Sequence, residues 1–274
     1  MTTPTPIKAG ELGLRVISGG TNQTRVADLR QRYPQRVTSA LHCDPDYPDA
    51  AVVCVQSPSG GAFSDDELIT NIDAGPGTHL RLTTQAATQV FAGAGTGTRH
   101  SLDFGLHPGA VVEYLPQTLI PHRGSSYTQR LNVAMASTAT YLGWDVLAAG
   151  RIGHGERYAF DSVDNAVEVT VGGRIAMRDR QRVTSAAARA IGADYLATML
   201  VLAPWVDTGG LLGAVRRVLA PTDVSAGASE LPGGVGVIVR TTTDRAPLLS
   251  QFQEQLLRTV RGVLIGERNG NSAR

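Results

Sequence analysis

The chain has 274 residues, enough to bury a sizeable core as one large or two small domains. Its net charge of +1 and hydrophobic fraction of 42% are ordinary for a globular protein and favour neither nucleic acid nor a membrane surface as a partner. The N-terminus shows no signal peptide and no apolar run approaches the length of a membrane span, so a cytoplasmic protein is expected.

Short strands are predicted along most of the chain, because apolar and polar residues alternate between closely spaced glycines and prolines. Helices do not intervene, which favours a body built mainly of strands. The segment 24–35 is polar, with Leu29 and Tyr33 as candidate anchors, and has no predicted strand. The predicted strands are residues 10–18, 51–56, 68–74, 79–82, 99–106, 110–115, 127–135, 139–148 and 234–241.

Glycine-rich segments predict the turns between these strands. Gly75-Pro76-Gly77 is a strong turn signal, and Gly60-Gly61 permits backbone angles that a β-carbon would forbid. Gly172-Gly173 suits the two positive-φ positions of a tight turn, so residues 167–180 are predicted to form a hairpin. The glycine-rich segment 93–97 lacks the Lys-Ser/Thr ending of a phosphate loop and is predicted to be a flexible hairpin connection.

Two helices are predicted near the C-terminus. Thr208 is a candidate N-cap for a helix that runs to Ala220 and stops before Pro221, with its apolar residues on one face. Asp244 is a candidate cap for a longer second helix, whose apolar residues also recur at helical spacing.

The chain is predicted to form one domain over residues 1–274, because no convincing internal repeat or linker divides it. The polar ends, residues 1–9 and 267–274, are predicted to be disordered tails.

The sequence contains no recognisable catalytic or metal-binding constellation. Asp65, Asp66 and Glu67 are adjacent carboxylates, but successive residues of a strand alternate faces and nothing positions a substrate. Cys43 lies in a His-Cys-Asp triplet, which is a weak metal signal without a second ligand pair. Two alternatives remain open on these residues: a β-rich hydrolase or isomerase using Asp65, Asp66 or Glu67, and a β protein that binds a small ligand.

One motif extends over the stretch 57–91. It consists of Gly60, Gly61, Asp66, Gly75, Pro76, Gly77 and the Leu-Thr-Thr-Gln-Ala-Ala-Thr run at 82–88. In this motif the stretch resembles the urease accessory protein UreD family, also called UreH. Two departures stand out: Ser64 and Asp65 occupy positions where the family often has a second glycine pair, and Gln89 stands where lysine is common.

The middle of the chain extends the resemblance. Residues 113–117, Glu-Tyr-Leu-Pro-Gln, are similar to the family's Glu-Trp-Leu-Pro-Gln, and Trp144-Asp145 is similar to its Trp-Glu. Gly150-Arg151 and Gly155-Glu156 match its Gly-Arg and Gly-Glu pairs. Weaker matches follow near the C-terminus at Val224-Ser225, Leu231-Pro232 and Val239-Arg240, and the resemblance spans about residues 25–265.

The resemblance implies a non-enzymatic scaffold of the mainly β class: a single-domain, helix-like stack of many short strands with about two α-helices near the C-terminus. It implies binding to UreF, to UreG through UreF, and to urease apoprotein, and a role in conveying nickel toward the urease active site. No tightly bound cofactor is expected, and contacts with Ni²⁺ are expected to be transient.

A nickel conduit must offset the dehydration of the ion and still release it, which suits dispersed oxygen ligands better than a closed Cys/His cage. Acidic positions that match the family are therefore the candidate path, with neutral polar residues beside them. The candidates are Asp66, Glu113, Asp145 and Glu156, with Thr83, Thr84 and Gln85 as neutral liners.

Overall fold

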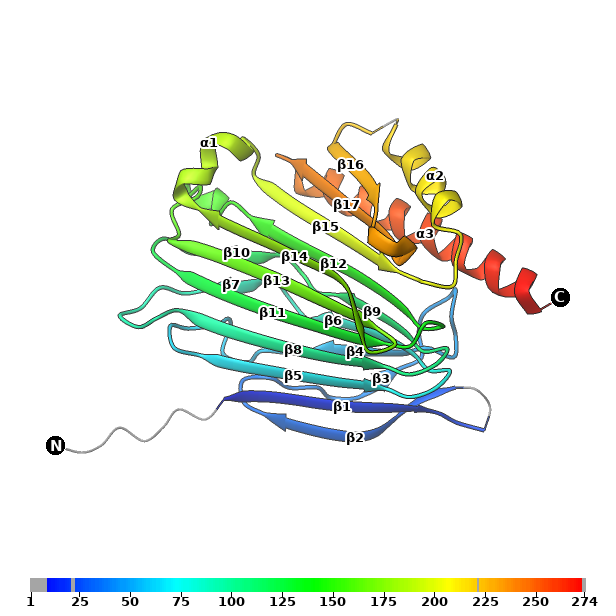
Figure 1. Cartoon of the computed structure of the whole chain (residues 1–274). Helices are drawn as coiled ribbons and strands as arrows, with labels where there is room; N and C mark the ends of the chain where they lie inside the picture. Colours follow the sequence, from blue (N-terminus) through cyan, green and yellow to red (C-terminus); the bar gives the residue numbers. More distant parts are fainter. Residues whose placement is uncertain (1–8, 21–22, 221, 273–274) are drawn as a thin grey trace.

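Two β-sheets lie face to face, and two helices, α2 (Thr208–Leu219) and α3 (Ala246–Ser272), cover the outer face of the larger sheet (Figure 1). The structure is a computed structural model that describes residues 9–20, 23–220 and 222–272. Within these residues, none of the helices combines the length and apolar character that a membrane-spanning helix needs.

The smaller sheet has seven strands in the order β14-β13-β11-β8-β5-β1-β2, and the larger has ten. The larger runs β16-β17-β15-β12-β9-β6-β4-β3, with β7 and β10 beside β12. The smaller sheet contains β1 (Gly10–Ser18), β2 (Thr24–Arg32), β5 (Glu67–Ala74), β8 (Thr98–Leu106), β11 (Ser126–Met135), β13 (Ser162–Val171) and β14 (Arg174–Thr184). The larger contains β3 (Ala40–Leu41), β4 (Ala51–Val55), β6 (His79–Thr84), β7 (Thr88–Val90), β9 (Val111–Leu115), β10 (Leu119–Pro121), β12 (Thr140–Ala148), β15 (Tyr195–Leu202), β16 (Ser225–Glu230) and β17 (Gly236–Thr243). The remaining short elements are α1 (Ala188–Ile191) and the 3-10 turns η1 (Ile152–His154), η2 (Ser185–Ala187) and η3 (Pro232–Gly234).

Between β5 and β13 the chain passes back and forth between the two sheets, so this part winds as a helix-like stack. β5 is followed by β6 in the opposite sheet, β8 by β9, and β11 by β12. Strands of successive turns then pair in parallel within each sheet, as β5 does with β8 and β6 with β9. The predicted mainly β, helix-like stack with two helices near the C-terminus is confirmed.

In this part of the chain the glycine-rich turns lead from one sheet to the other instead of closing a hairpin. Gly77, with φ of 65°, lies in the turn between β5 and β6, which do not pair. The prediction of a hairpin connection at 93–97 is wrong for the same reason, because this segment leads from β7 in the larger sheet to β8 in the smaller one. The local sequence indicates where the chain turns, but a strand of the stack pairs with a strand one winding further along the chain, as β5 does with β8.

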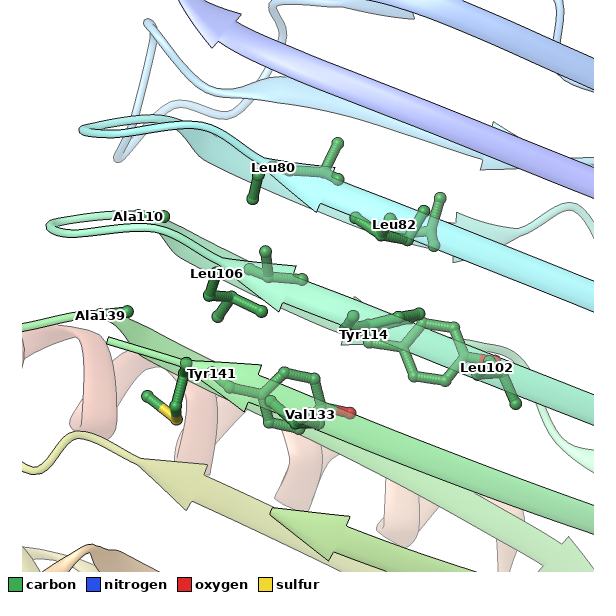
Figure 2. Packing of buried hydrophobic residues seen from close by; sticks show 14 of the residues in the cluster. Leu80, Leu82, Leu102, Leu106, Ala110, Tyr114, Val133, Ala139 and Tyr141 are labelled. Atoms are coloured by element: carbon green, nitrogen blue, oxygen red, sulfur yellow. The ribbon is translucent and has the colours of Figure 1, made fainter. Parts of the chain in front are cut away.

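Apolar side chains of the inner faces fill the space between the sheets. Figure 2 shows Leu80, Leu82 and Tyr114 of the larger sheet near Leu102 and Val133 of the smaller one. All five are at least 94% buried, and their alternation with outward residues is the period-2 pattern of strands.

A second core lies between the larger sheet and the two helices. Trp144 of β12 and Val239 of β17 pack there with Leu211 of α2 and Phe252 of α3. The strands of the larger sheet are therefore buried on both faces in this region, which explains why β12 and β15 contain near-continuous apolar runs.

Several element boundaries differ from the sequence predictions. β2 occupies the polar segment 24–32 as an edge strand, with Leu29 packed against the core and Tyr33 56% exposed. The hairpin of β13 and β14 is confirmed, with positive φ at Gly172 and Gly173. α3 continues to Ser272 and so includes residues 267–272, which the sequence analysis assigned to a tail; residues 1–8 and 273–274 of the predicted tails lie outside the described residues.

The predicted helix caps are corrected by the structure. Asp207 is the N-cap of α2, and its carboxylate accepts hydrogen bonds from the backbone N–H groups of Gly209 and Gly210, both at 3.1 Å. Thr208 is already the first helical residue, and its hydroxyl donates to Glu230 instead. The carboxylate of Asp244 accepts from the backbone N–H of Asp194 at 2.9 Å, and α3 begins two residues later.

Candidate functional site in the cavity between the sheets

A cavity of about 160 Å³ lies between the two sheets, near the strand ends that are farthest from the Gly75-Pro76-Gly77 turn. Its walls combine apolar and polar side chains from both sheets, and Gly60 and Gly61 lie at its edge. A Cβ on Gly61 would lie 2.4 Å from the carbonyl oxygen of Gln89, so this glycine permits a close approach of two backbone segments. The Gly-Gly loop and the Gly-Pro-Gly turn, adjacent in the sequence motif, are thus at opposite ends of β5.

The smaller sheet presents a row of polar side chains to this cavity. His100 of β8 pairs in register with Gln129 of β11, which in turn pairs with Asn165 of β13. Directly opposed residues of neighbouring strands point to the same face, and the strands are about 4.8 Å apart. The three side chains therefore form a ladder that crosses the strands, and all three line the cavity.

Hydrogen bonds link the ladder to buried groups on either side. The hydroxyl of Tyr127 donates to Gln129 Oε1 at 3.1 Å and lies 3.1 Å from Nδ1 of His100. Nε2 of His100 lies 3.0 Å from the hydroxyl of Thr70, which donates to Gln35 Oε1 at 2.8 Å. Burial lowers the pKa of His100 to about 4, so the ring is neutral at pH 7.

Asp145 is the carboxylate of this cavity. It lies on β12 of the larger sheet, and it has no ion-pair partner within the described part of the chain. Burial raises its pKa to about 6, against the opposing effect of a hydrogen bond from Gln129. Above that pH the cavity holds a negative charge whose neighbours are amide and hydroxyl groups, an arrangement that attracts a cation.

The structure brings only part of the predicted path to this cavity. Thr84 and Gln85 line it together with Asp145. Thr83 points to the other side of β6, and its hydroxyl donates to the carbonyl oxygen of Leu115 at 2.8 Å.

Glu113 lies on the opposite face of the larger sheet from Asp145. Its partner on β12 is Leu142, three residues before Asp145, and an odd separation reverses the face of a strand. Arg261 of α3 donates to Glu113 from Nε at 2.9 Å and also to Asp44. Burial alone would raise the pKa of Glu113, but hydrogen bonds from His79 and Arg261 outweigh it and hold the pKa low.

Glu156 and Asp66 are also engaged outside the cavity lining. Arg151 donates to Glu156 from Nε at 2.9 Å, and this hydrogen bond is the main reason that the pKa of Glu156 falls to about 2. Asp66 accepts from the backbone N–H of Phe63 at 2.8 Å and so closes the turn that precedes β5. These carboxylates have stabilising partners that a passing cation would have to displace.

The adjacent acids proposed for an alternative hydrolase are not assembled into a pocket. Asp65 accepts hydrogen bonds from the backbone N–H and the hydroxyl of Thr96, which ties it to the 93–97 segment. Glu67 is exposed at the start of β5. Among the described residues no three His, Cys, Asp or Glu side chains converge as a metal site, and Cys43 is exposed.

The sequence analysis missed His100, Gln129 and Asn165 because they lie on three separate strands. A signal was nevertheless present, since each occupies the inward phase of its strand among buried apolar residues. In β11, for example, Gln129 falls between Tyr127 and Leu131, both at least 97% buried. A polar residue in the buried phase of an alternating strand is a candidate for a site.

Comparison with known proteins gives consistent results over nearly the whole chain. The family described as UreD urease accessory protein matches residues 8–273. The chain is 50% identical to a urease accessory protein UreD of Mycolicibacterium gilvum (strain PYR-GCK), over 97% of this chain and 98% of the relative. It is 30% identical to urease accessory protein UreD 2 of Streptomyces griseus subsp. griseus (95% and 92%), and 31% identical to UreD of Haloarcula marismortui (88% and 82%).

Proposed function

This chain belongs to the UreD family of urease accessory proteins, and we propose that it conveys nickel toward the urease active site as a scaffold docked on urease apoprotein. In this proposal UreF binds the chain, UreG binds through UreF, and UreG hydrolyses the GTP. Nickel is the cargo of the protein, not a resident cofactor, and no residue of the chain is assigned a catalytic role.

One observation carries the proposal: Asp145 is a carboxylate in an interior cavity without a basic partner among the described residues. A divalent cation that enters loses water, and the carboxylate offsets part of that cost. The ladder of His100, Gln129 and Asn165 supplies further oxygen and nitrogen groups on the facing sheet. One carboxylate that has no basic partner in the described part of the chain, surrounded by neutral polar groups, favours entry of a cation and still allows its release, as conduction requires.

The proposed path therefore narrows to Asp145, with Thr84 and Gln85 as neutral liners, and gains the ladder residues. Glu113 and Glu156 are left out because arginine side chains already neutralise them. Asp66 is left out because it closes a turn.

The experiment is urease activation across a nickel series, with the chain co-produced with UreF, UreG and urease apoprotein. Asp145→Asn should raise the nickel concentration for half-maximal activation several-fold, while pull-down of UreF and urease stays normal. Excess nickel should restore activation, because occupancy of a weak site rises with concentration. Asp103→Asn is the matched control, since this strand carboxylate is exposed on the outer face of the smaller sheet.

Unchanged activation of Asp145→Asn at limiting nickel would show that the cavity carboxylate is not on the path. Loss of partner binding together with activity would assign Asp145 to the fold or to an interface.

A further inference from the structure

The polar ladder continues beyond Asp145, and we propose that it ends in a gate in which the Asp179–Arg240 ion pair closes a second mouth of the interior passage. The identity of the cation that passes rests on the proposed function. The gate itself rests on strand register, cavities and hydrogen bonds.

Strand register aligns two rows of polar residues that face each other. In the smaller sheet the row that contains Gln129 and Asn165 continues to Gln181 of β14. In the larger sheet Asp145 of β12 pairs with Thr198 of β15, and Thr198 pairs with Arg240 of β17. Because in-register partners share a face, both rows run across the strands toward the same end of the stack.

Cavities follow these rows. A second cavity of about 30 Å³ shares Asp145 and Asn165 with the first cavity and is also lined by Thr198 and Gln181. A groove of about 220 Å³ shares Gln181 with the second cavity and is lined by Arg240. The shared residues place the three spaces in succession from the interior to the surface.

The second cavity contains oxygen atoms that have no hydrogen-bond partner in the part of the chain that the structure describes. Neither the Tyr141 hydroxyl nor Asn165 Oδ1 has a hydrogen-bond partner among the described residues, although both atoms are buried. Both side chains line this cavity with the Asp145 carboxylate. Buried polar atoms without partners are costly, so these oxygens are suited to a transient occupant. The volume is sufficient for about one water molecule or one largely dehydrated cation.

The ion pair stands between the second cavity and the groove. A terminal nitrogen of Arg240 donates to both carboxylate oxygens of Asp179 at 2.7 Å, and the other donates to the Thr198 hydroxyl at 3.3 Å. Asp179 lines the second cavity, whereas Arg240 lines the groove. The two side chains are 29% and 38% exposed, as expected at a boundary between interior and solvent.

In the closed state the Arg240 guanidinium places a positive charge at the end of the passage. It also binds the Asp179 carboxylate, which would otherwise be the next ligand of a cation. A divalent cation in the second cavity repels Arg240 and competes with it for Asp179. Release of Arg240 then opens the passage to the groove and leaves Asp179 as the last oxygen ligand. The gate is therefore opened by its own cargo.

Thiol labelling tests the gate without using nickel. In the full chain co-purified with its accessory partners, Thr198→Cys places a thiol in the second cavity, and peptide-resolved mass spectrometry follows its reaction with a methanethiosulfonate reagent. Arg240→Gln should increase the labelling rate at least tenfold, with Arg240→Lys in between. The exposed Cys43 is an internal reference whose rate should not change.

Arg178→Gln in the Thr198→Cys background is the matched control. Arg178 lies next to Asp179 on β14, and its Nε is 2.7 Å from Oε2 of Glu168 on β13, which makes a similar ion pair. Arg178 lines neither of the two cavities nor the groove. Equal labelling rates in the Arg240 and Arg178 variants would overturn the gate. A melting temperature close to that of the parent is required of each variant, and Arg240→Lys serves if Arg240→Gln fails to fold.

Urease activation distinguishes the gate from the proposed function. Asp179→Asn should raise the nickel concentration for half-maximal activation several-fold, as is also expected of Asp145→Asn. If Asp145→Asn has this effect and Asp179→Asn does not, the cargo leaves by another route and the gate is overturned while the proposed function stands. If neither has an effect but Arg240→Gln exposes the thiol, the gate exists and nickel conveyance fails.

Discussion

Arg261 of α3 and Glu113 of β9 are joined by two hydrogen bonds although 148 residues separate them in the chain. The same guanidinium also contacts Asp44 and Asp46 and lies over the ring of Tyr47. This buried cluster fastens the C-terminal helix to the sheet. It explains why Glu113 matches a family position without lining the cavity.

Arg261→Met should therefore reduce stability by about 3–5 kcal/mol at pH 7, because it leaves buried carboxylates without a cation. Glu113 has a lowered pKa, so its contribution is present above its unfolded pKa and is lost as pH falls through its folded pKa. The difference in the free energy of unfolding between variant and parent, measured by urea unfolding, should therefore be smaller at pH 4 than at pH 7. Arg178→Met, which removes an exposed pair, is the control and should cost at most about 1 kcal/mol.

The contribution of Asp145 to stability should depend on pH in the opposite sense to that of Glu113. The folded pKa of Asp145, about 6, lies above the unfolded value, so the folded state binds the extra proton and stability falls as pH rises from about 4 to 6. Asp145→Asn removes this loss and should be more stable than the parent at pH 7, by about 3 kcal/mol at most. Melting curves at pH 4 and 7 test this difference in stability, with Asp49→Asn as the control because Asp49 is exposed. An equal difference between variant and parent at both pH values would contradict the raised pKa.

Gly77→Val should destabilise the fold by about 1 kcal/mol or more, because φ of 65° is unfavourable for a β-branched residue. Apart from its two chain neighbours, no heavy atom of the described residues lies within 4 Å of the position that a Cβ would occupy, so the expected loss comes from backbone conformation alone. Gly153→Val is the matched control, with open space and no positive φ. Similar melting temperatures for the two variants would refute the backbone explanation.

Asp207→Ala should cost about 1 kcal/mol, because two backbone N–H groups at the start of α2 lose their acceptor. Ser250→Ala, on the exposed side of α3, should be close to neutral. Urea unfolding of the two variants checks this, and a neutral Asp207→Ala would mean that water replaces the cap at no cost.

Sequence alone determined the class of elements in this protein. Apolar segments between glycines and prolines located β1, β8, β9, β11 and β12 to within one residue. Alternation with period 2 is clear in β8 and β11, where one strand face is buried and the other is more exposed. The turn of the β13–β14 hairpin was predictable from its two glycines, because a tight turn with positive φ at both central residues favours glycine there. The family resemblance rested on motifs of this local kind.

Only the tertiary structure decided which carboxylates share a space. Asp145 and Glu113 looked equivalent in sequence, but an odd offset in register puts them on opposite faces of the larger sheet. Asp145 faces the cavity, whereas Glu113 faces Arg261. The ladder of His100, Gln129 and Asn165 likewise depends on parallel pairing of strands from successive turns. Register between distant strands follows from the packing of the whole stack, and no local pattern encodes it.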